Sequence, residues 1–124
     1  MSVRTILHVE DNELNRKMIR DLLRRTAYRL IEAPDGEAGV AIARGQRPDL
    51  ILMDVQLPKI SGIEATRRLR AEPATADIPI IAITSFALGG DEQRAKEAGA
   101  SAYLAKPYSP FTLLGMIRAL LPEE

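Results

Sequence analysis

Cysteine and tryptophan are both absent from the 124-residue chain, and aromatic residues of any kind are scarce, with 3 Tyr and 2 Phe. Without cysteine the chain can form no disulfide, no thiol nucleophile and no thiolate metal site. So few rings cannot supply a surface that binds nucleic acid by stacking its bases. An excess of charge is missing too, since 17 Lys and Arg balance 17 Asp and Glu. A chain of zero net charge has no bulk attraction for nucleic acid or for an anionic membrane.

Long apolar runs are also missing. No stretch is long enough to cross a bilayer, and the first residues lack the apolar segment of a signal peptide. We therefore expect a cytoplasmic protein with neither nucleic acid nor membrane as a partner. The length suits a single domain over residues 1–124, with no output domain after it.

Short apolar segments alternate along the chain with segments of helical period, a pattern typical of βαβ units around a parallel sheet. Strands are predicted at residues 3–9, 28–33, 50–55, 78–84 and 102–105. The third and fourth are almost continuously apolar, as central strands covered on both faces are. The predicted fold class is α/β, a doubly wound, three-layer (βα)5 fold of the flavodoxin-like kind with strand order 2-1-3-4-5.

Capping residues mark where the intervening helices begin and end. The first helix is predicted to run from Asn12 to about Arg25, with Ile19, Leu22 and Leu23 facing the core. The remaining boundaries are predicted from the same kinds of residue: Asp35 and Gly45 for the second helix, Ser61 and Arg70 for the third, Gly99 for the end of the fourth, and Ser109-Pro110 for the start of the fifth.

Polar side chains follow four of the five predicted strands at the point where each strand ends. They are Glu10 and Asp11, Asp54, Thr84, and Lys106. Because ligands of doubly wound sheets bind at the carboxyl ends of the strands, we expect these groups to meet at one edge. Each acid alone could be a helix cap or a solvated loop charge, but three carboxylates together repel one another unless a cation joins them. A site made only of oxygen ligands suits Mg²⁺ better than zinc.

With these residues the chain resembles the receiver domain of response regulators, a CheY-like domain, over essentially its whole length. The resemblance rests on Glu10-Asp11, on Asp54 within LILMDVQLPKISG, on Thr84-Ser85 and on residues 103–107, YLAKP. The segments VEDNELN, DLILMDVQLP and GDEQRAKEAGASAYLAKP also resemble the DivK type of single-domain receiver.

The resemblance implies that Asp54 accepts a phosphoryl group from a histidine kinase or a histidine phosphotransfer protein. It also implies that Mg²⁺ is held by Asp11, Asp54 and the backbone carbonyl of Gln56, with Glu10 acting through water. Lys106, followed by a cis peptide bond to Pro107, and Thr84 would contact phosphoryl oxygens. Such a protein catalyses only its own phosphorylation and dephosphorylation and is otherwise not an enzyme.

Two further residues, Phe86 and Tyr103, have two interpretations each. Gln56 and Phe86 flank the predicted phosphorylation site and could tune the lifetime of the phosphoryl group, although Phe86 could equally pack against a loop. Tyr103 stands where the family's switch places an aromatic residue that moves with Thr84, but it could also be a static strand residue.

The fourth helix, which offers mainly Leu88, Ala95 and Ala98 for packing after Gly89-Gly90, is predicted to be weakly held.

A partner surface is predicted at the same edge. Leu14 and Met18 fall outside the core face of the first helix, and Tyr108 and Phe111 are expected to be exposed near the last helix. These four residues could dock a partner or form ordinary edge packing. His8 is interpreted as structural, and the basic residues around the first helix as a solvated face.

Two enzymatic or cofactor-binding alternatives fit the residues less well. A phosphatase of the haloacid dehalogenase kind needs a second acid where Gln56 stands, and an FMN carrier needs a phosphate-binding loop where Glu10 and Asp11 would repel the phosphate. A receiver-like module that works as a protein adaptor without phosphorylation stays open. A downstream adaptor protein as target, and a monomer or weak dimer, are expectations as well.

Overall fold

The computed structural model describes residues 3–85 and 90–123. Its centre is a five-stranded sheet in which every neighbouring pair is parallel. The order β2-β1-β3-β4-β5 confirms the predicted fold class and topology. The strands are β1 (Thr5–Val9), β2 (Arg29–Ala33), β3 (Leu50–Asp54), β4 (Ile80–Thr84) and β5 (Ala102–Ala105).

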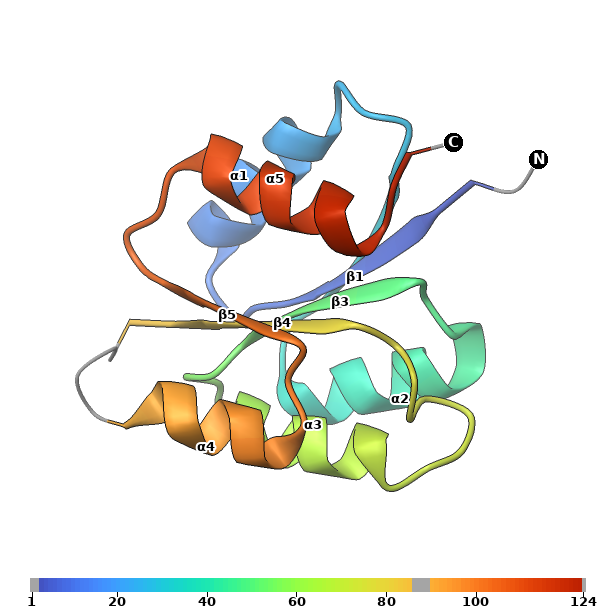
Figure 1. Ribbon diagram of the computed structural model, residues 1–124, viewed down its shortest axis with the longest axis vertical. Helices are drawn as coiled ribbons and strands as arrows, with labels where there is room; N and C mark the ends of the chain where they lie inside the picture. The colour runs from blue at the N-terminus through green and yellow to red at the C-terminus, as the bar shows by residue number, and fades with distance from the viewer. Residues whose placement is uncertain (1–2, 86–89, 124) are drawn as a thin grey trace.

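Five helices cover the two faces of this sheet (Figure 1). Two of them, α1 (Glu13–Leu23) and α5 (Pro110–Leu120), lie above the sheet in that view. The other three, α2 (Gly36–Gln46), α3 (Gly62–Arg70) and α4 (Asp91–Ala98), lie below it. Among the described residues, no helix combines the length and the apolar character needed to cross a bilayer.

The sheet separates two sets of buried side chains, because successive strand residues point to opposite faces. Ile6 packs with the core under α1 and α5, whereas its neighbour Leu7 packs with the core under α2 and α3. A third and much smaller core holds α4 through Ala95 and Ala98. Alanine side chains bury little apolar area, so α4 is the least strongly packed helix of its layer.

Most of the predicted helix boundaries are confirmed. The side chains of Asn12, Asp35, Ser61 and Ser109 all accept a hydrogen bond from the first turn of the helix that follows. The prediction that Gly45 ends the second helix is wrong: α2 continues to Gln46, and Arg47 takes the left-handed conformation, with φ 45°. Gly45 is exposed and helical, so nothing in its surroundings makes use of its conformational freedom. The first helix is also shorter than predicted, ending at Leu23.

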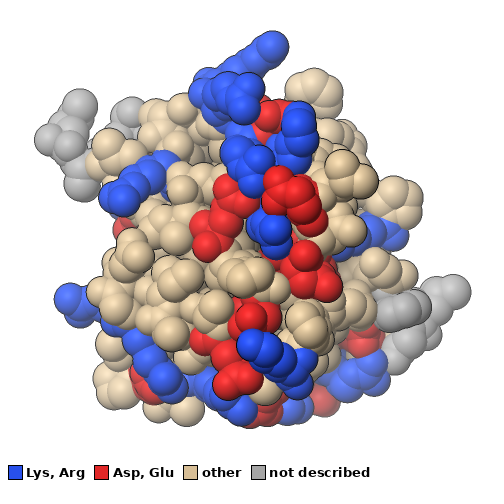
Figure 2. All heavy atoms as spheres, turned by 180° about the vertical axis from the view of Figure 1, so that it is seen from behind, with Lys and Arg blue, Asp and Glu red and all other residues tan. Residues whose placement is uncertain are grey.

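Four of the basic residues in and after α1 are paired with acids rather than gathered into a stripe of one charge. Arg16 contacts Glu13, Arg20 contacts Glu32, and Lys17 and Arg24 both contact Asp21. Seen from behind (Figure 2), acidic and basic side chains alternate in a band across this face. The charges of this helix are therefore largely balanced by their neighbours.

His8 lies in the middle of β1 and is 2% exposed. Its Nδ1 atom has no hydrogen-bond partner among the described residues. Burial lowers the pKa of His8 from 6.5 to about 4, and the nearby Glu10 and Glu32 carboxylates only partly oppose that shift. The folded protein therefore keeps this imidazole neutral at pH values where the unfolded chain protonates it.

Replacing this imidazole with an apolar side chain, His8→Ile, should make stability less dependent on pH between 6.5 and 4. Above pH 6.5 the histidine is neutral in both states; as the pH falls from there to 4, only the unfolded chain gains the proton, so the wild type loses stability. The wild type should lose about 3 kcal/mol more than the variant over this interval. Urea unfolding in EDTA at several pH values measures this, and parallel pH profiles for the two proteins would contradict it.

Candidate functional site

Three carboxylates meet at the carboxyl edge of the sheet. Glu10 and Asp11 follow β1, Asp54 ends the neighbouring strand β3, and one oxygen of each lies within 4.8 Å of the others. Glu10 and Asp54 are buried, whereas Asp11 is exposed. The sequence predicted this convergence, and the structure brings the three acids together as expected.

A single ammonium group lies between the two buried acids. Lys106 follows β5, and its Nζ is 3.1 Å from Glu10 Oε1 and 3.3 Å from Asp54 Oδ2. Burial alone would lower the pKa of Lys106, but Asp54 and Glu10 outweigh that effect and raise it, so the side chain stays charged. The Lys106–Pro107 peptide bond is cis, as the resemblance implied. Three acids facing one cation leave the site with a surplus of negative charge.

Backbone groups hold the acids in place. The Gln56 N–H donates to Asp54 Oδ1 at 3.0 Å, and the Asn12 N–H lies 3.3 Å from Glu10 Oε2. The Arg16 guanidinium donates to the Glu10 carbonyl oxygen at 2.7 Å, which ties α1 to the end of β1. The donor atoms available to a cation here are all oxygens, the set that Mg²⁺ prefers.

Gly62, at the start of α3, supports the site and was not singled out from the sequence. A Cβ atom at this position would lie 2.0 Å from the carbonyl oxygen of Asp54. The Gly62 N–H also donates to the Val55 carbonyl at 3.0 Å. Only a residue without a side chain lets α3 approach the backbone of Asp54 so closely. The only signal in the sequence was the pair Ser61-Gly62 after β3. Ser61 was explained as a helix cap, and the glycine beside it was given no role.

Thr84 ends β4, and its hydroxyl belongs to a second network beside the acids. The Thr84 hydroxyl donates to Asp91 Oδ2 at 2.7 Å, and the Gln56 amide nitrogen lies 2.9 Å from both the Thr84 oxygen and Asp91 Oδ2. Asp91 was missed from the sequence, because an acid in the first turn of a helix is ordinary there. The Gln56 side chain, predicted to tune the phosphoryl lifetime, is thus engaged by Thr84 and Asp91.

The remaining predicted residues are placed as follows. Tyr103 on β5 is half-buried. Burial and the Asp91 carboxylate raise the pKa of its phenol, and a contact with the Thr84 hydroxyl opposes that effect.

Three of the predicted docking residues are exposed as expected. The exposed fraction of the residue is 76% for Leu14, 42% for Met18 and 82% for Phe111. The prediction for Tyr108 is wrong: it is half-buried, because its side chain packs against the core under α1 and α5. Phe86, and with it the proposed shielding role, lies outside the described residues, as do Leu88 and Gly89.

Comparison with known proteins agrees with this geometry. Residues 6–118 match the response regulator receiver domain family. The chain belongs to this family. It is 43% identical over 120 residues to the polar-differentiation response regulator DivK of Brucella anthropi, a match that covers 97% of this chain and 98% of the relative.

Solved structures of other receivers have the same fold. The receiver domain of a sensor histidine kinase from Pseudomonas aeruginosa, solved with a magnesium ion coordinated in its active-site cleft, is 40% identical with a TM-score of 0.89 and covers 96% of this chain and 98% of its own. The chemotaxis protein CheY4 of Vibrio cholerae is 30% identical with a TM-score of 0.89, covering 97% and 100%. The receiver fold of this chain is thus shown by sequence and structure alike.

Replacing the bridging cation, in Lys106→Met, should destabilise the protein in EDTA by about 3 kcal/mol, because two buried carboxylates then face each other unpaired. Added Mg²⁺ should recover more stability in this variant than in the wild type, since the metal no longer shares the carboxylates with an ammonium group. Thermal unfolding with and without Mg²⁺ measures both effects.

The matched control is Lys96→Met on the exposed face of α4, which should respond to Mg²⁺ as the wild type does. Equal stabilisation of Lys106→Met and the wild type by Mg²⁺ would mean that the metal binds away from these carboxylates.

Proposed function

We propose that this chain is a response regulator of the DivK type, which acts in the cytoplasm by accepting a phosphoryl group on Asp54 from a histidine kinase or a histidine phosphotransfer protein. The observation that supports this most strongly is the position of Asp54. Its carboxylate is buried next to two further acids and within 3.3 Å of the Lys106 ammonium group. A phosphoryl acceptor needs this combination of nucleophile, cation and metal ligands.

The transfer is a displacement at phosphorus. An Asp54 oxygen forms the new bond to phosphorus as the bond from phosphorus to the donor nitrogen breaks, and the electron pair of that bond stays on the departing imidazole, which takes up a proton from water. Lys106 balances charge on a phosphoryl oxygen, and the Thr84 hydroxyl donates to another. The Gln56 N–H keeps the other Asp54 oxygen oriented at 3.0 Å.

Asp11, Asp54 and the Gln56 backbone carbonyl would hold Mg²⁺, with Glu10 acting through water. Bound there, the metal would neutralise charge on the phosphoryl oxygens during transfer. The negative surplus of the acids over Lys106 and their all-oxygen donor set fit this ion. The protein would catalyse no reaction besides its own phosphorylation and dephosphorylation. Gln56 supports this, since its amide cannot act as the second acid of a phosphatase that uses an aspartyl phosphate.

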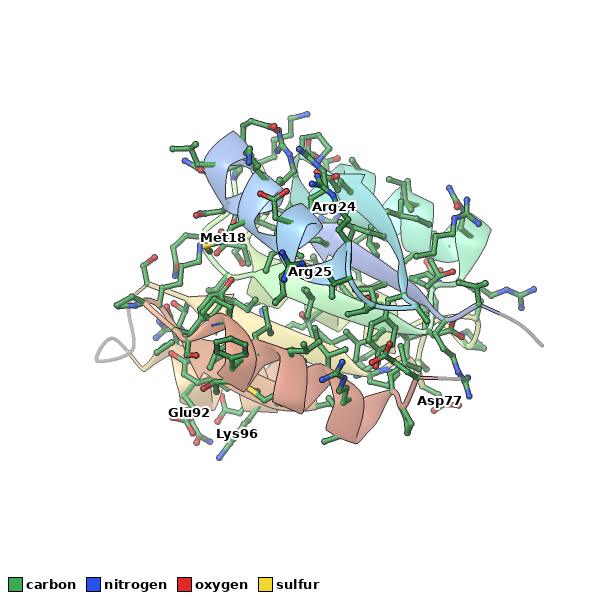
Figure 3. All side chains as sticks on the ribbon, turned by 90° about the horizontal axis from the view of Figure 1, so that it is seen from above. Met18, Arg24, Arg25, Asp77, Glu92 and Lys96 are labelled. Carbon is green, nitrogen blue, oxygen red and sulfur yellow. The ribbon has the colours of Figure 1, made fainter. Side chains whose placement is uncertain are left out.

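The partner would approach over α1 and α5. A groove of about 400 Å³ between them is lined by Met18 and Leu22 of α1 and by Phe111 and Leu114 of α5. From above (Figure 3), Met18 lies between the two helices. A second hollow of about 420 Å³ continues from Met18 to Lys106 and Tyr108. Exposed apolar side chains next to the acceptor carboxylate suit a protein that must bring its phosphohistidine to Asp54.

Removing the nucleophile in Asp54→Asn should abolish labelling by radioactive acetyl phosphate or by a phosphorylated kinase, because an amide is not a nucleophile for phosphorus. The control is Asp77→Asn, the same change at an exposed acid remote from the site, which should label like the wild type. Thermal unfolding verifies that both variants fold. Undiminished labelling of Asp54→Asn would remove this residue as acceptor, and an unlabelled wild type would favour an adaptor that works without phosphorylation.

Placing a charge on the proposed docking surface, in Leu14→Asp, should slow phosphotransfer from a protein donor about tenfold, as expected for an apolar anchor at an interface. Labelling by acetyl phosphate should not change, because the small donor needs no docking surface. Val3→Asp is the matched control: Val3 is also apolar and 61% exposed but lies before β1, at the opposite edge of the sheet. Equal transfer rates for the two variants would contradict docking at Leu14.

A further inference from the structure

Asp91 is a buried acid that the proposed chemistry leaves without a role. It is the first residue of α4 and is 4% exposed. The next residue, Glu92, is also an acid of the first turn, but its side chain points outward from the molecule (Figure 3). Burial alone would raise the pKa of Asp91, but hydrogen bonds from Thr84, Arg94 and Gln56 outweigh that effect and lower it. The carboxylate is therefore charged, and its partners are the two residues that flank the acceptor site and one residue of its own helix.

The hydroxyl of Thr84 has only one proton to donate. The side chains beside it include two strong acceptors, Asp91 Oδ2 at 2.7 Å and Gln56 Oε1 at 3.1 Å. The shorter contact is to a charged acceptor, and charge-assisted hydrogen bonds are about twice as strong as neutral ones. Thr84 therefore gives its proton to Asp91, and a proton held there is not available to a phosphoryl oxygen on Asp54.

The Gln56 amide strengthens this arrangement. Its oxygen accepts from the Ser85 N–H at 2.9 Å, so its nitrogen must be the atom that faces Thr84 and Asp91. The amide nitrogen thus donates to the same carboxylate oxygen that Thr84 uses. When Thr84 turns away, Asp91 keeps Gln56 and Arg94 as donors, so release breaks one hydrogen bond and does not leave a bare buried charge.

We infer that Asp91 is a positioning residue for the phosphorylation switch: its carboxylate holds the Thr84 hydroxyl at the start of α4 until a phosphoryl group on Asp54 competes for the same proton. This inference rests on the proposed function. It makes α4 the element that senses the transfer, because the bond that breaks joins β4 to the first residue of α4. The helix is suited to respond, since Ala95 and Ala98 are its only buried apolar residues.

The test is the equilibrium affinity for beryllofluoride, a mimic of the phosphoryl group, in the presence of Mg²⁺. Asp91→Ala should bind it about tenfold more tightly than the wild type, because Thr84 no longer has to leave a charged acceptor. Asp91→Asn, whose neutral oxygen accepts more weakly, should fall between the two. A tighter-binding variant is an outcome that a merely structural role for Asp91 would not give.

Glu92→Ala is the matched control. It removes the same charge from the same helical turn, where an acid favours the helix dipole, but the side chain is exposed. We expect wild-type affinity for this variant. In a Thr84→Ala background, Asp91→Ala should give no further gain, because the hydroxyl that Asp91 restrains is gone. Affinity in Asp91→Ala that is equal to or weaker than in the wild type, or a gain that persists without the Thr84 hydroxyl, would overturn the inference.

A second measurement separates this inference from the proposed function. In the protein without donor or metal, the methyl resonance of Thr84 should shift in Asp91→Ala and stay in place in Glu92→Ala. No shift would overturn the contact itself, whatever the protein does with phosphate. A wild type that neither labels with acetyl phosphate nor binds beryllofluoride would instead refute the proposed function. If Asp91→Ala does not fold, the order of affinities for Asp91→Asn, Glu92→Ala and the wild type decides.

Discussion

The architecture of the site depends on one interaction, the contact of the Lys106 ammonium group with Glu10 and Asp54. Two buried carboxylates at the ends of β1 and β3 would repel each other, and the lysine after β5 removes that repulsion. Three strands of the sheet are thus joined at the edge where the chemistry is proposed. The same contact is incomplete, since one cation faces three acids. Under the proposed function, a divalent cation and a phosphoryl group would enter as a pair, each balancing the charge of the other.

The fold and the acidic site could be predicted from the sequence because both follow from topology. Parallel strands end at one edge, so residues such as Asp11 and Asp54 that follow strands must converge there. Asp91 could not be found in this way, because its burial depends on how α4 packs against β4 and not on any local pattern. Tyr108 was predicted to be exposed because it follows Pro107 in a loop. Its position in the sequence does not show that the side chain packs against the core under α1 and α5. Gly45 suggested a helix end only because glycine is common there. In the structure the helix continues past it to Gln46.

The two faces of the sheet have different tasks. Leu113 and Ile117 of α5, together with Ile19 and Leu23 of α1, form a large apolar core, which gives the proposed docking surface a firm base. On the other face, α4 itself packs only through a small core that is rich in alanine, and polar contacts hold the start of this helix. Polar contacts can be exchanged for others of similar strength, whereas a large apolar core cannot be opened at low cost. A firmly packed docking surface on α1 and α5 and a helix that can rearrange, α4, are therefore both proposed for one small protein.

The close approach of Gly62 to the Asp54 carbonyl decides in which direction a disturbance at Asp54 can travel. Because α3 meets the backbone of Asp54 with no side chain between them, the Asp54 backbone has little room to move toward α3. Under the proposed function, a rearrangement that begins at Asp54 would then be taken up on the other side of β3, through Thr84 and the start of α4. Gly62 takes no part in the chemistry although it lies beside the proposed acceptor, and in this way it would block movement on one side of the site and direct the response toward α4.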